Sequence, residues 1–198
     1  MAEANDFYVA SRTGPLRQGE ILSDLKQIVP IAGSVFHELR VDIIEHPFAV
    51  VLSQDCDLEQ DFYAREGLKN QKQIERPEIN ERRKLSSVLF CDATPTDELR
   101  NRINDARVWK TVLQNMNERY QFLREIKPGQ DASEKGVPSG LGLDFKRYFS
   151  IPTEEVYAQA EQLKNRRGIL QTPYAEHLNV RFHFYQMRIA LPKAHHAD

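Results

Sequence analysis

Two short runs of consecutive apolar residues constrain the fold of this chain most strongly. Residues 48–52 (FAVVL) are apolar without interruption, and so are residues 88–90 (VLF). A short uninterrupted apolar run is typical of a β-strand that is buried on both faces, because neither face can point to water. We therefore expect these two segments to pair as the central strands of one sheet.

Further strand signals lie on either side of these runs. Residues 19–22 (GEIL) follow a turn-like Gly-Pro pair, and residues 35–45 are rich in β-branched and aromatic side chains. Residues 143–151 have the composition of a later strand. These patterns predict a β-rich core that spans residues 7–94 and is completed by the strand at 143–151.

Helices are expected in the second half of the chain. The sequence TPTD at residues 94–97 places a capping threonine before a proline, so one or two helices should follow it. Acidic residues at 154–155 and basic residues at 166–167 predict a helix between them, because these charges suit the two ends of the helix dipole. A last helix is predicted from apolar residues spaced by three or four, namely Tyr174, Leu178, Phe182, Tyr185 and Ile189. We place these C-terminal helices within residues 153–191.

The length of 198 residues suits one domain with a sizeable core, and we assign residues 1–198 to a single domain. Residues 57–84 are mostly polar and predict an excursion from the core that is part helix and part loop. Residues 127–142 contain four glycines and two prolines, which predicts a flexible, solvated loop.

Composition excludes several classes of function. The net charge of -2 arises from 27 basic and 29 acidic residues, so any contact with nucleic acid must be made by a local patch. No apolar run approaches the ~20 residues that span a bilayer, and the first residues lack the pattern of a signal peptide. We therefore expect a cytoplasmic protein with no membrane contact. The two cysteines, Cys56 and Cys91, are expected to be reduced thiols.

The most distinctive motif is SQDCD at residues 53–57, directly after the first apolar run. In a catalytic interpretation, Cys56 is a nucleophile activated by His46, but Asp55 and Asp57 would raise the pKa of the thiol and oppose that activation. In a structural interpretation, Cys56 is a small buried side chain and the two carboxylates cap the turn. We then expect loss of Asp57 to destabilise the fold and loss of Asp55 to be nearly neutral.

A metal site is a further alternative for the same residues. Cys56, Cys91, an aspartate and a histidine are all acceptable zinc ligands, provided that the ends of the two apolar strands lie side by side. The chain has no closely spaced Cys-x-x-Cys or His-x-x-x-His pair to support such a site. We therefore predict no metal and no cofactor.

The predicted terminal helix offers a candidate nucleic-acid-binding face. Arg181 and Arg188 are seven residues apart, so they share a face near Tyr174 and Tyr185. Arginines interleaved with aromatic side chains can hold phosphates and stack on bases. In the alternative interpretation the aromatic residues form the packing stripe and the arginines its solvated or ion-paired flank.

The order of GEI at residues 19–21, a strand pair and PFAVVLS at residues 47–53 resembles the opening of MazF/PemK-like proteins. The resemblance covers about the first quarter to third of the chain. It implies an α+β fold in which helices pack around a small, strongly bent SH3-like barrel. The SQDCD motif, together with residues near 173–192, also resembles a group of prokaryotic proteins that have not been tied to an activity.

The MazF/PemK resemblance implies a nucleic-acid-interacting module, in a toxin–antitoxin or phage-defence setting. MazF-like toxins are implied to cleave single-stranded RNA without metal, using an arginine and a threonine or serine. The arginine expected before Pro47 is His46 in this chain, so nuclease activity does not follow from the resemblance. Arg17 and Ser53 are candidates to bind phosphate.

Two other classes of function remain open from the sequence. One is a non-catalytic protein-binding or regulatory subunit, or a homodimer, that uses the helical face. The other is a thiol- or metal-dependent enzyme centred on Cys56.

Overall fold

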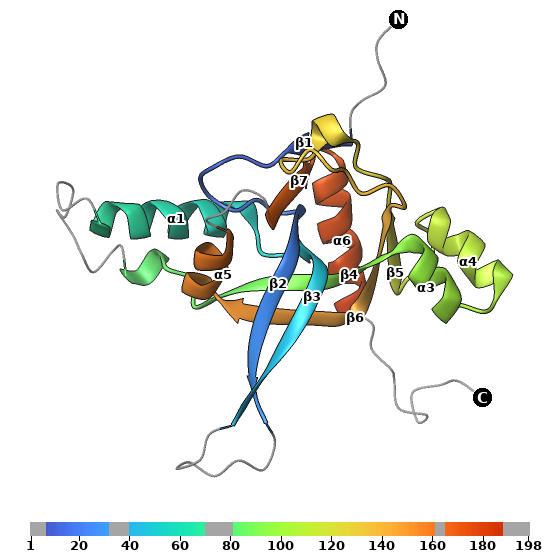
Figure 1. Ribbon diagram of the computed structural model, residues 1–198, viewed down its shortest axis with the longest axis horizontal. Coiled ribbons are helices and arrows are strands. Elements are labelled where there is room, and N and C mark those ends of the chain that lie inside the picture. The colour runs from blue at the N-terminus through green and yellow to red at the C-terminus, as the bar shows by residue number, and fades with distance from the viewer. Residues whose placement is uncertain (1–6, 32–39, 70–80, 161–164, 188–198) are drawn as a thin grey trace, which may run out of the picture.

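The computed structural model describes residues 7–31, 40–69, 81–160 and 165–187. These residues form a mixed α+β fold around a seven-stranded antiparallel sheet with the strand order β1-β7-β2-β3-β4-β6-β5 (Figure 1). The strands are β1 (Tyr8–Ala10), β2 (Glu20–Pro30), β3 (Val41–Val51), β4 (Ser87–Pro95), β5 (Tyr120–Leu123), β6 (Leu141–Pro152) and β7 (Arg166–Leu170). The helices are α1 (Asp55–Lys69), α3 (Thr96–Arg102), α4 (Ala106–Leu113), the short 3-10 helix η1 (Pro128–Gln130), α5 (Thr153–Ala160) and α6 (Tyr174–Gln186).

The two apolar runs form the centre of the sheet, as predicted. β3 pairs with β4 in antiparallel register, with Val50 opposite Cys91 and Val51 opposite Phe90. Successive side chains of a strand point to opposite faces, and here both faces are covered. An uninterrupted apolar run is therefore what this position in the fold requires.

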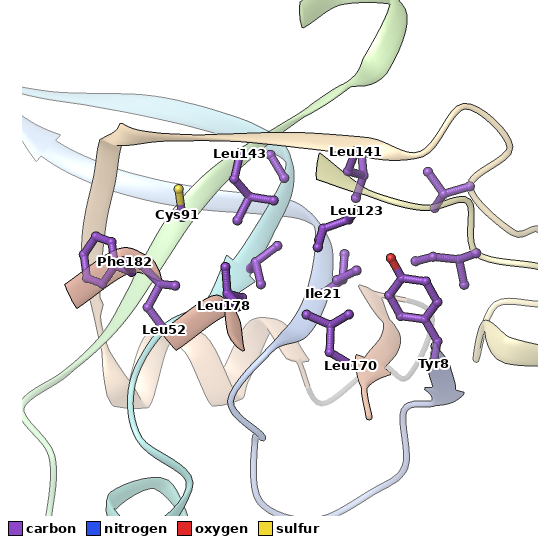
Figure 2. Packing of buried hydrophobic residues seen from close by; sticks show 14 of the residues in the cluster. Tyr8, Ile21, Leu52, Cys91, Leu123, Leu141, Leu143, Leu170, Leu178 and Phe182 are labelled. Atoms are coloured by element: carbon purple, nitrogen blue, oxygen red, sulfur yellow. The ribbon is translucent and has the colours of Figure 1, made fainter. Parts of the chain in front are cut away.

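One face of the sheet is covered by α6, and we call the cluster between them the α6-side core. Leu178 and Phe182 of α6 pack with Leu52, Cys91 and other buried residues of the sheet (Figure 2). Full burial of one such aliphatic or aromatic side chain stabilises the fold by about 1.5–3 kcal/mol. This core fixes α6 against the middle of the sheet.

The opposite face of the sheet is covered by α1 and α5, which gives a second cluster, the α1-side core (Figure 1). Leu58 of α1 and Val156 of α5 are both fully buried there. The predicted excursion after residue 57 therefore begins as a helix that belongs to the core, and residues 70–80 lie outside the described residues.

The predicted α+β class is confirmed, but the sheet is not closed into the small, strongly bent barrel that we expected. β1 and β5 are the two ends of the strand order. The ends are linked by side chains instead: the Tyr8 hydroxyl donates a hydrogen bond of 2.9 Å to the Arg124 carbonyl, directly after β5. β5 has four residues and β1 has three, and the strand order does not pair them with each other.

The segment at 127–142, predicted as a flexible loop, has a more definite form than its composition indicates. The Arg167 guanidinium donates hydrogen bonds of 2.8 and 2.6 Å to Asp131 and one of 2.8 Å to the Gly136 carbonyl. Burial would raise the pKa of Asp131, but the hydrogen bonds from Arg167 and Ser133 outweigh it, so this pKa lies below its ordinary value. A buried ion pair therefore holds the segment against β7.

The predicted helix from 153 to 168 is wrong in its second half. α5 ends at Ala160, and the basic residues at 166–167 belong to β7. Arg166 is buried and donates hydrogen bonds of 2.6 and 2.9 Å to Glu20 on the neighbouring strand. These arginines neutralise buried carboxylates from other elements, which a helix-dipole argument cannot anticipate.

Gly168 allows β7 to lie close to η1. A Cβ atom at this position would lie 2.9 Å from the Gln130 carbonyl oxygen, so only glycine allows the two backbones to approach so closely. Two helices, α3 and α4, follow as predicted, but α3 begins at Thr96 with Pro95 as its N-cap and no side-chain cap, so the predicted capping by Thr94 is wrong. The predicted terminal helix is confirmed as α6 from Tyr174 to Gln186, and Ile189 of its predicted stripe lies outside the described residues. In the described ranges, no helix is both long and apolar enough to cross a membrane.

Candidate functional site

The SQDCD motif joins β3 to α1, and its first residue has a structural role. The Leu52 amide donates to the Leu89 carbonyl at 2.8 Å, and the Ser53 hydroxyl accepts a hydrogen bond of 2.9 Å from the Leu89 amide. Ser53 thus continues the pairing of β3 with the start of β4 for one more residue. Its oxygen satisfies a backbone donor, which argues against the predicted phosphate contact.

Asp55 is the residue of the motif with the most contacts to distant parts of the chain. Its carboxylate accepts hydrogen bonds from the Gln18 amide at 2.6 Å and from the Arg17 guanidinium at 2.7 Å. The predicted phosphate ligand Arg17 is therefore paired with a predicted catalytic acid. Asp57 is exposed in the first turn of α1, so these contacts favour Asp55, not Asp57, as the carboxylate that matters for stability.

The predicted catalytic set is not assembled around Cys56. Cys56 is exposed, which also contradicts the interpretation of Cys56 as a buried side chain, and its thiol lies 3.6 Å from Asp57 Oδ1. His46 lies six residues before Leu52 on an extended strand, roughly 20 Å along β3. Its ring nitrogens lie 3.3 Å from Asp92 Oδ1 and 3.3 Å from Gln27 Oε1. His46 therefore has partners other than the thiol.

Cys91 cannot share a metal with Cys56. Antiparallel pairing places the end of β3 beside the start of β4, so Cys91 lies in the α6-side core while Cys56 belongs to α1 on the other face. Burial, with the nearby carboxylates of Asp144 and Asp92, raises the pKa of Cys91 well above its ordinary value. Across the part of the chain that the structure describes, no three His, Cys, Asp or Glu side chains gather to hold a metal ion.

Arg181 has a structural role in α6. Its guanidinium donates hydrogen bonds to the carbonyls of Asn115, Asn117 and Tyr120, which tie α6 to the turn before β5. Burial lowers the pKa of Arg181. This residue is therefore engaged with backbone carbonyls, and its predicted companion Arg188 lies outside the described residues.

A different group of side chains forms an open hollow between β6 and the end of α6. The hollow has a volume of about 560 Å³ and is lined by Lys146, Tyr148, Tyr185 and Gln186. We call this group the β6–α6 hollow. It combines two aromatic rings, one cation and one amide at the surface.

A bulge in β6 presents the first two of these residues. Leu143 pairs with Ala93 and Tyr148 pairs with Cys91, so residues 144–147 of β6 lie opposite the single residue Asp92. Bulges of this kind re-aim side chains and are common beside functional sites. Here the bulge brings Tyr148 against Phe182 of α6, with ring centroids 5.6 Å apart and planes at 73°.

Ion pairs hold the bulge from both sides. Asp144 accepts two hydrogen bonds from the Arg119 guanidinium, of 2.7 and 2.5 Å. Asp92 is paired with Arg147 at 3.1 Å and with His46. The acidic residues at the bulge are thus already neutralised by partners, which leaves the exposed Lys146 ammonium as a positive charge at the hollow.

The His46 ring supports the bulge through packing as well. It stacks on Phe149 with ring centroids 3.7 Å apart and planes 8° from parallel. Phe149 follows the bulge by two residues on β6. His46, predicted as a catalytic base, therefore links β3 to β4 through Asp92 and to β6 through Phe149.

The sequence contained a signal for the hollow that our prediction did not use. The strand at 143–151 is interrupted by the sequence KRY at residues 146–148, which breaks its apolar pattern. Such an interruption indicates a bulge or an exposed stretch of strand. The pattern cannot show that Tyr148 meets α6, because that contact depends on the size of the bulge.

No protein-family model, curated protein or solved structure matches this chain. The resemblance to MazF/PemK-like proteins therefore depends on the residues at 19–21 and 47–53 alone.

Proposed function

We propose that this protein is a nucleic-acid-interacting module related to MazF/PemK-like proteins, acting in the cytoplasm, and that it binds single strands at the β6–α6 hollow. The observation that carries the proposal is the pairing of two tyrosines with a lysine in one open hollow of about 560 Å³. Single strands are bound by aromatic side chains that stack on bases beside cations that contact phosphates.

The tyrosines of the hollow are held in place before any ligand binds. Tyr148 packs edge-on against Phe182, and Tyr185 lies 5.9 Å from Phe145, measured between ring centroids. Phe145 and Phe182 are both buried in the α6-side core. Because the rings are supported by buried neighbours, stacking a base on them costs little further side-chain ordering.

The relation to an SH3-like fold is part of the same proposal. Its support is the curvature of the sheet, whose two ends come close enough for Tyr8 to reach the Arg124 carbonyl. The buried side chains of the α6-side core come from β1, from β5 and from the strands between them, which is the packing expected inside a strongly curled sheet (Figure 2).

We propose that binding occurs without cleavage. The position that carries arginine in the resembling family is His46 here, and this residue is 8% exposed, with its ring between Asp92, Gln27 and Phe149. A side chain enclosed in this way is poorly placed to contact a transferring phosphate. A setting in a toxin–antitoxin or phage-defence system is consistent with a binding module that has lost the nuclease reaction.

Fluorescence polarisation with a labelled single-stranded RNA tests this proposal. Stacking of one base is worth about 1–3 kcal/mol, so Tyr148→Ala should raise Kd by roughly 5- to 150-fold. Tyr63→Ala is the matched control, since Tyr63 is 60% exposed on α1 at the other face of the sheet and should not affect Kd. Equal loss in both variants, or no binding by the parent protein, would refute the proposal.

A pulldown beside the polarisation assay distinguishes the alternative class of function. A protein that does not bind RNA but retains one stable protein partner in a pulldown would be a protein-binding or regulatory subunit. Incubation of the RNA with the protein in the absence of metal should leave the RNA intact.

A further inference from the structure

The β2–β3 hairpin extends beyond the rest of the sheet as a two-stranded ribbon (Figure 1). β2 pairs with β7 only as far as Leu22, and β3 pairs with β4 only from Phe48 onward. We call residues 26–30 and 41–45 the β-arm. Over these residues, the strand pairing in the described chain is that of β2 with β3.

One face of the β-arm is apolar although it is exposed. The register pairs Ile28 with Ile43 and Pro30 with Val41, so these four side chains share a face. Ile28 and Ile43 are each 55% exposed, and Val41 is 51% exposed. An isolated two-stranded ribbon is marginally stable in water, so an apolar face on such a ribbon is more stable when covered.

The outer edge of β2 is protected against pairing with another strand. Gln159 of α5 accepts a hydrogen bond of 2.7 Å from the Lys26 amide and donates one of 2.9 Å to the Lys26 carbonyl. Pro30 has no amide hydrogen to offer at the same edge. Association through the face of the β-arm is therefore favoured over addition of a strand to this edge.

The charges that flank the apolar face indicate its partner. Lys26 and Glu45 are opposite each other in the register, on the same face as Ile28 and Ile43, and their charged groups are 3.7 Å apart. A face with one positive and one negative charge is complementary to a copy of itself across a two-fold axis. A strongly acidic partner would place a like charge against Glu45, and a strongly basic partner would place one against Lys26.

From these observations we propose that the β-arm is a dimerisation surface whose occupant is the same face of a second copy of this chain. The apolar side chains expose on the order of 350 Å² per copy, comparable to the larger apolar patches of monomers. With about 60% of an interface apolar, two copies would bury roughly 1,200 Å² in total, at the lower end of specific interfaces. The dimer should therefore be reversible, with a Kd in the micromolar range. This surface is separate from the β6–α6 hollow, so its test does not depend on RNA binding.

Sedimentation equilibrium between about 1 and 200 µM protein tests the proposal, since this range spans the expected Kd. The parent protein should pass from monomer to dimer, and Ile43→Lys should remain a monomer because it places a charge in the apolar face. Val180→Lys is the control, because Val180 is 50% exposed on α6 away from the β-arm and should leave the dimer intact. Ile43→Thr retains a β-branched side chain and serves as the milder variant should Ile43→Lys melt early.

A pair of charge variants tests the geometry of the dimer itself. Glu45→Lys and Lys26→Glu should each be monomeric, because each brings like charges together across the two-fold axis. Their mixture should form a heterodimer, since the two altered faces are then complementary. A parent protein that is monomeric throughout, or a dimer that survives Ile43→Lys, or charge variants that fail to associate when mixed, would overturn the proposal.

Discussion

Replacement of Asp55 by alanine should destabilise the protein far more than replacement of Asp57. The Asp55 carboxylate accepts hydrogen bonds from the Gln18 amide and the Arg17 guanidinium, which link the start of α1 to the chain before β2. An amide hydrogen bond to a charged group is worth about 1.5–3 kcal/mol. The Arg17 pair is 38% and 42% exposed, so solvent screening limits it to about 0–1 kcal/mol.

These contributions predict a loss of about 2–3 kcal/mol in the free energy of unfolding for Asp55→Ala, or roughly 5–10 °C in Tm for a chain of this size. Asp57→Ala loses a charge at the helix N-terminus, worth about 0.3–1 kcal/mol, and the weak contact with the Cys56 thiol. Asp55→Asn retains an acceptor for the Gln18 amide and should fall between the two. Thermal melts followed by circular dichroism measure all three, and an Asp57→Ala variant that melts below Asp55→Ala would refute this reasoning.

Two further predictions concern buried groups. The pKa of Asp131 in the folded protein lies below its ordinary value. The ionised carboxylate therefore contributes fully to stability when the pH is above the pKa of this aspartate in the unfolded chain, and the contribution is lost as the pH falls through its lower pKa in the folded protein. Asp131→Asn should therefore be less stable than the parent at neutral pH, and urea titrations should show the difference shrinking below about pH 4; a constant difference would contradict the assignment. Cys56 is exposed and Cys91 is buried with a raised pKa, so a thiol reagent should modify one cysteine in the native protein and the second only after unfolding. Rapid modification of both thiols would show that the α6-side core opens readily.

The sequence was sufficient to predict the centre of the sheet because the local signal and the tertiary environment agree there. Val50 faces the α6-side core while its neighbours Ala49 and Val51 face the α1-side core. A strand with both faces covered must be apolar at every position, so an uninterrupted run identifies it. The start of α6 was predicted for a similar reason, since its apolar spacing follows the buried residues Leu178 and Phe182.

The predictions failed where a residue's role depends on a distant partner. Arg166 and Arg167 have the sequence position of a helix C-terminus, but they are buried because Glu20 and Asp131 lie opposite them. In the same way, the motif at 53–57 has the composition of a catalytic site, yet the Asp55 carboxylate forms an ion pair with Arg17. Partners that are far apart in sequence are not visible in the local pattern.

The candidate site could not be predicted because a backbone irregularity creates it. Lys146 and Tyr148 lie at a bulge of β6 in which several residues face the single residue Asp92. The amino-acid sequence marks this stretch as unusually polar for a strand, but the direction of its side chains depends on how the register shifts.

Ultraviolet crosslinking of the protein to a single-stranded RNA, followed by mass spectrometry of the crosslinked peptides, locates the surface that contacts the bases. We expect crosslinks at Tyr148 and Tyr185, because these rings line the β6–α6 hollow and are expected to stack on bases. Crosslinks confined to the β-arm or to α1, with none at the hollow, would contradict this expectation.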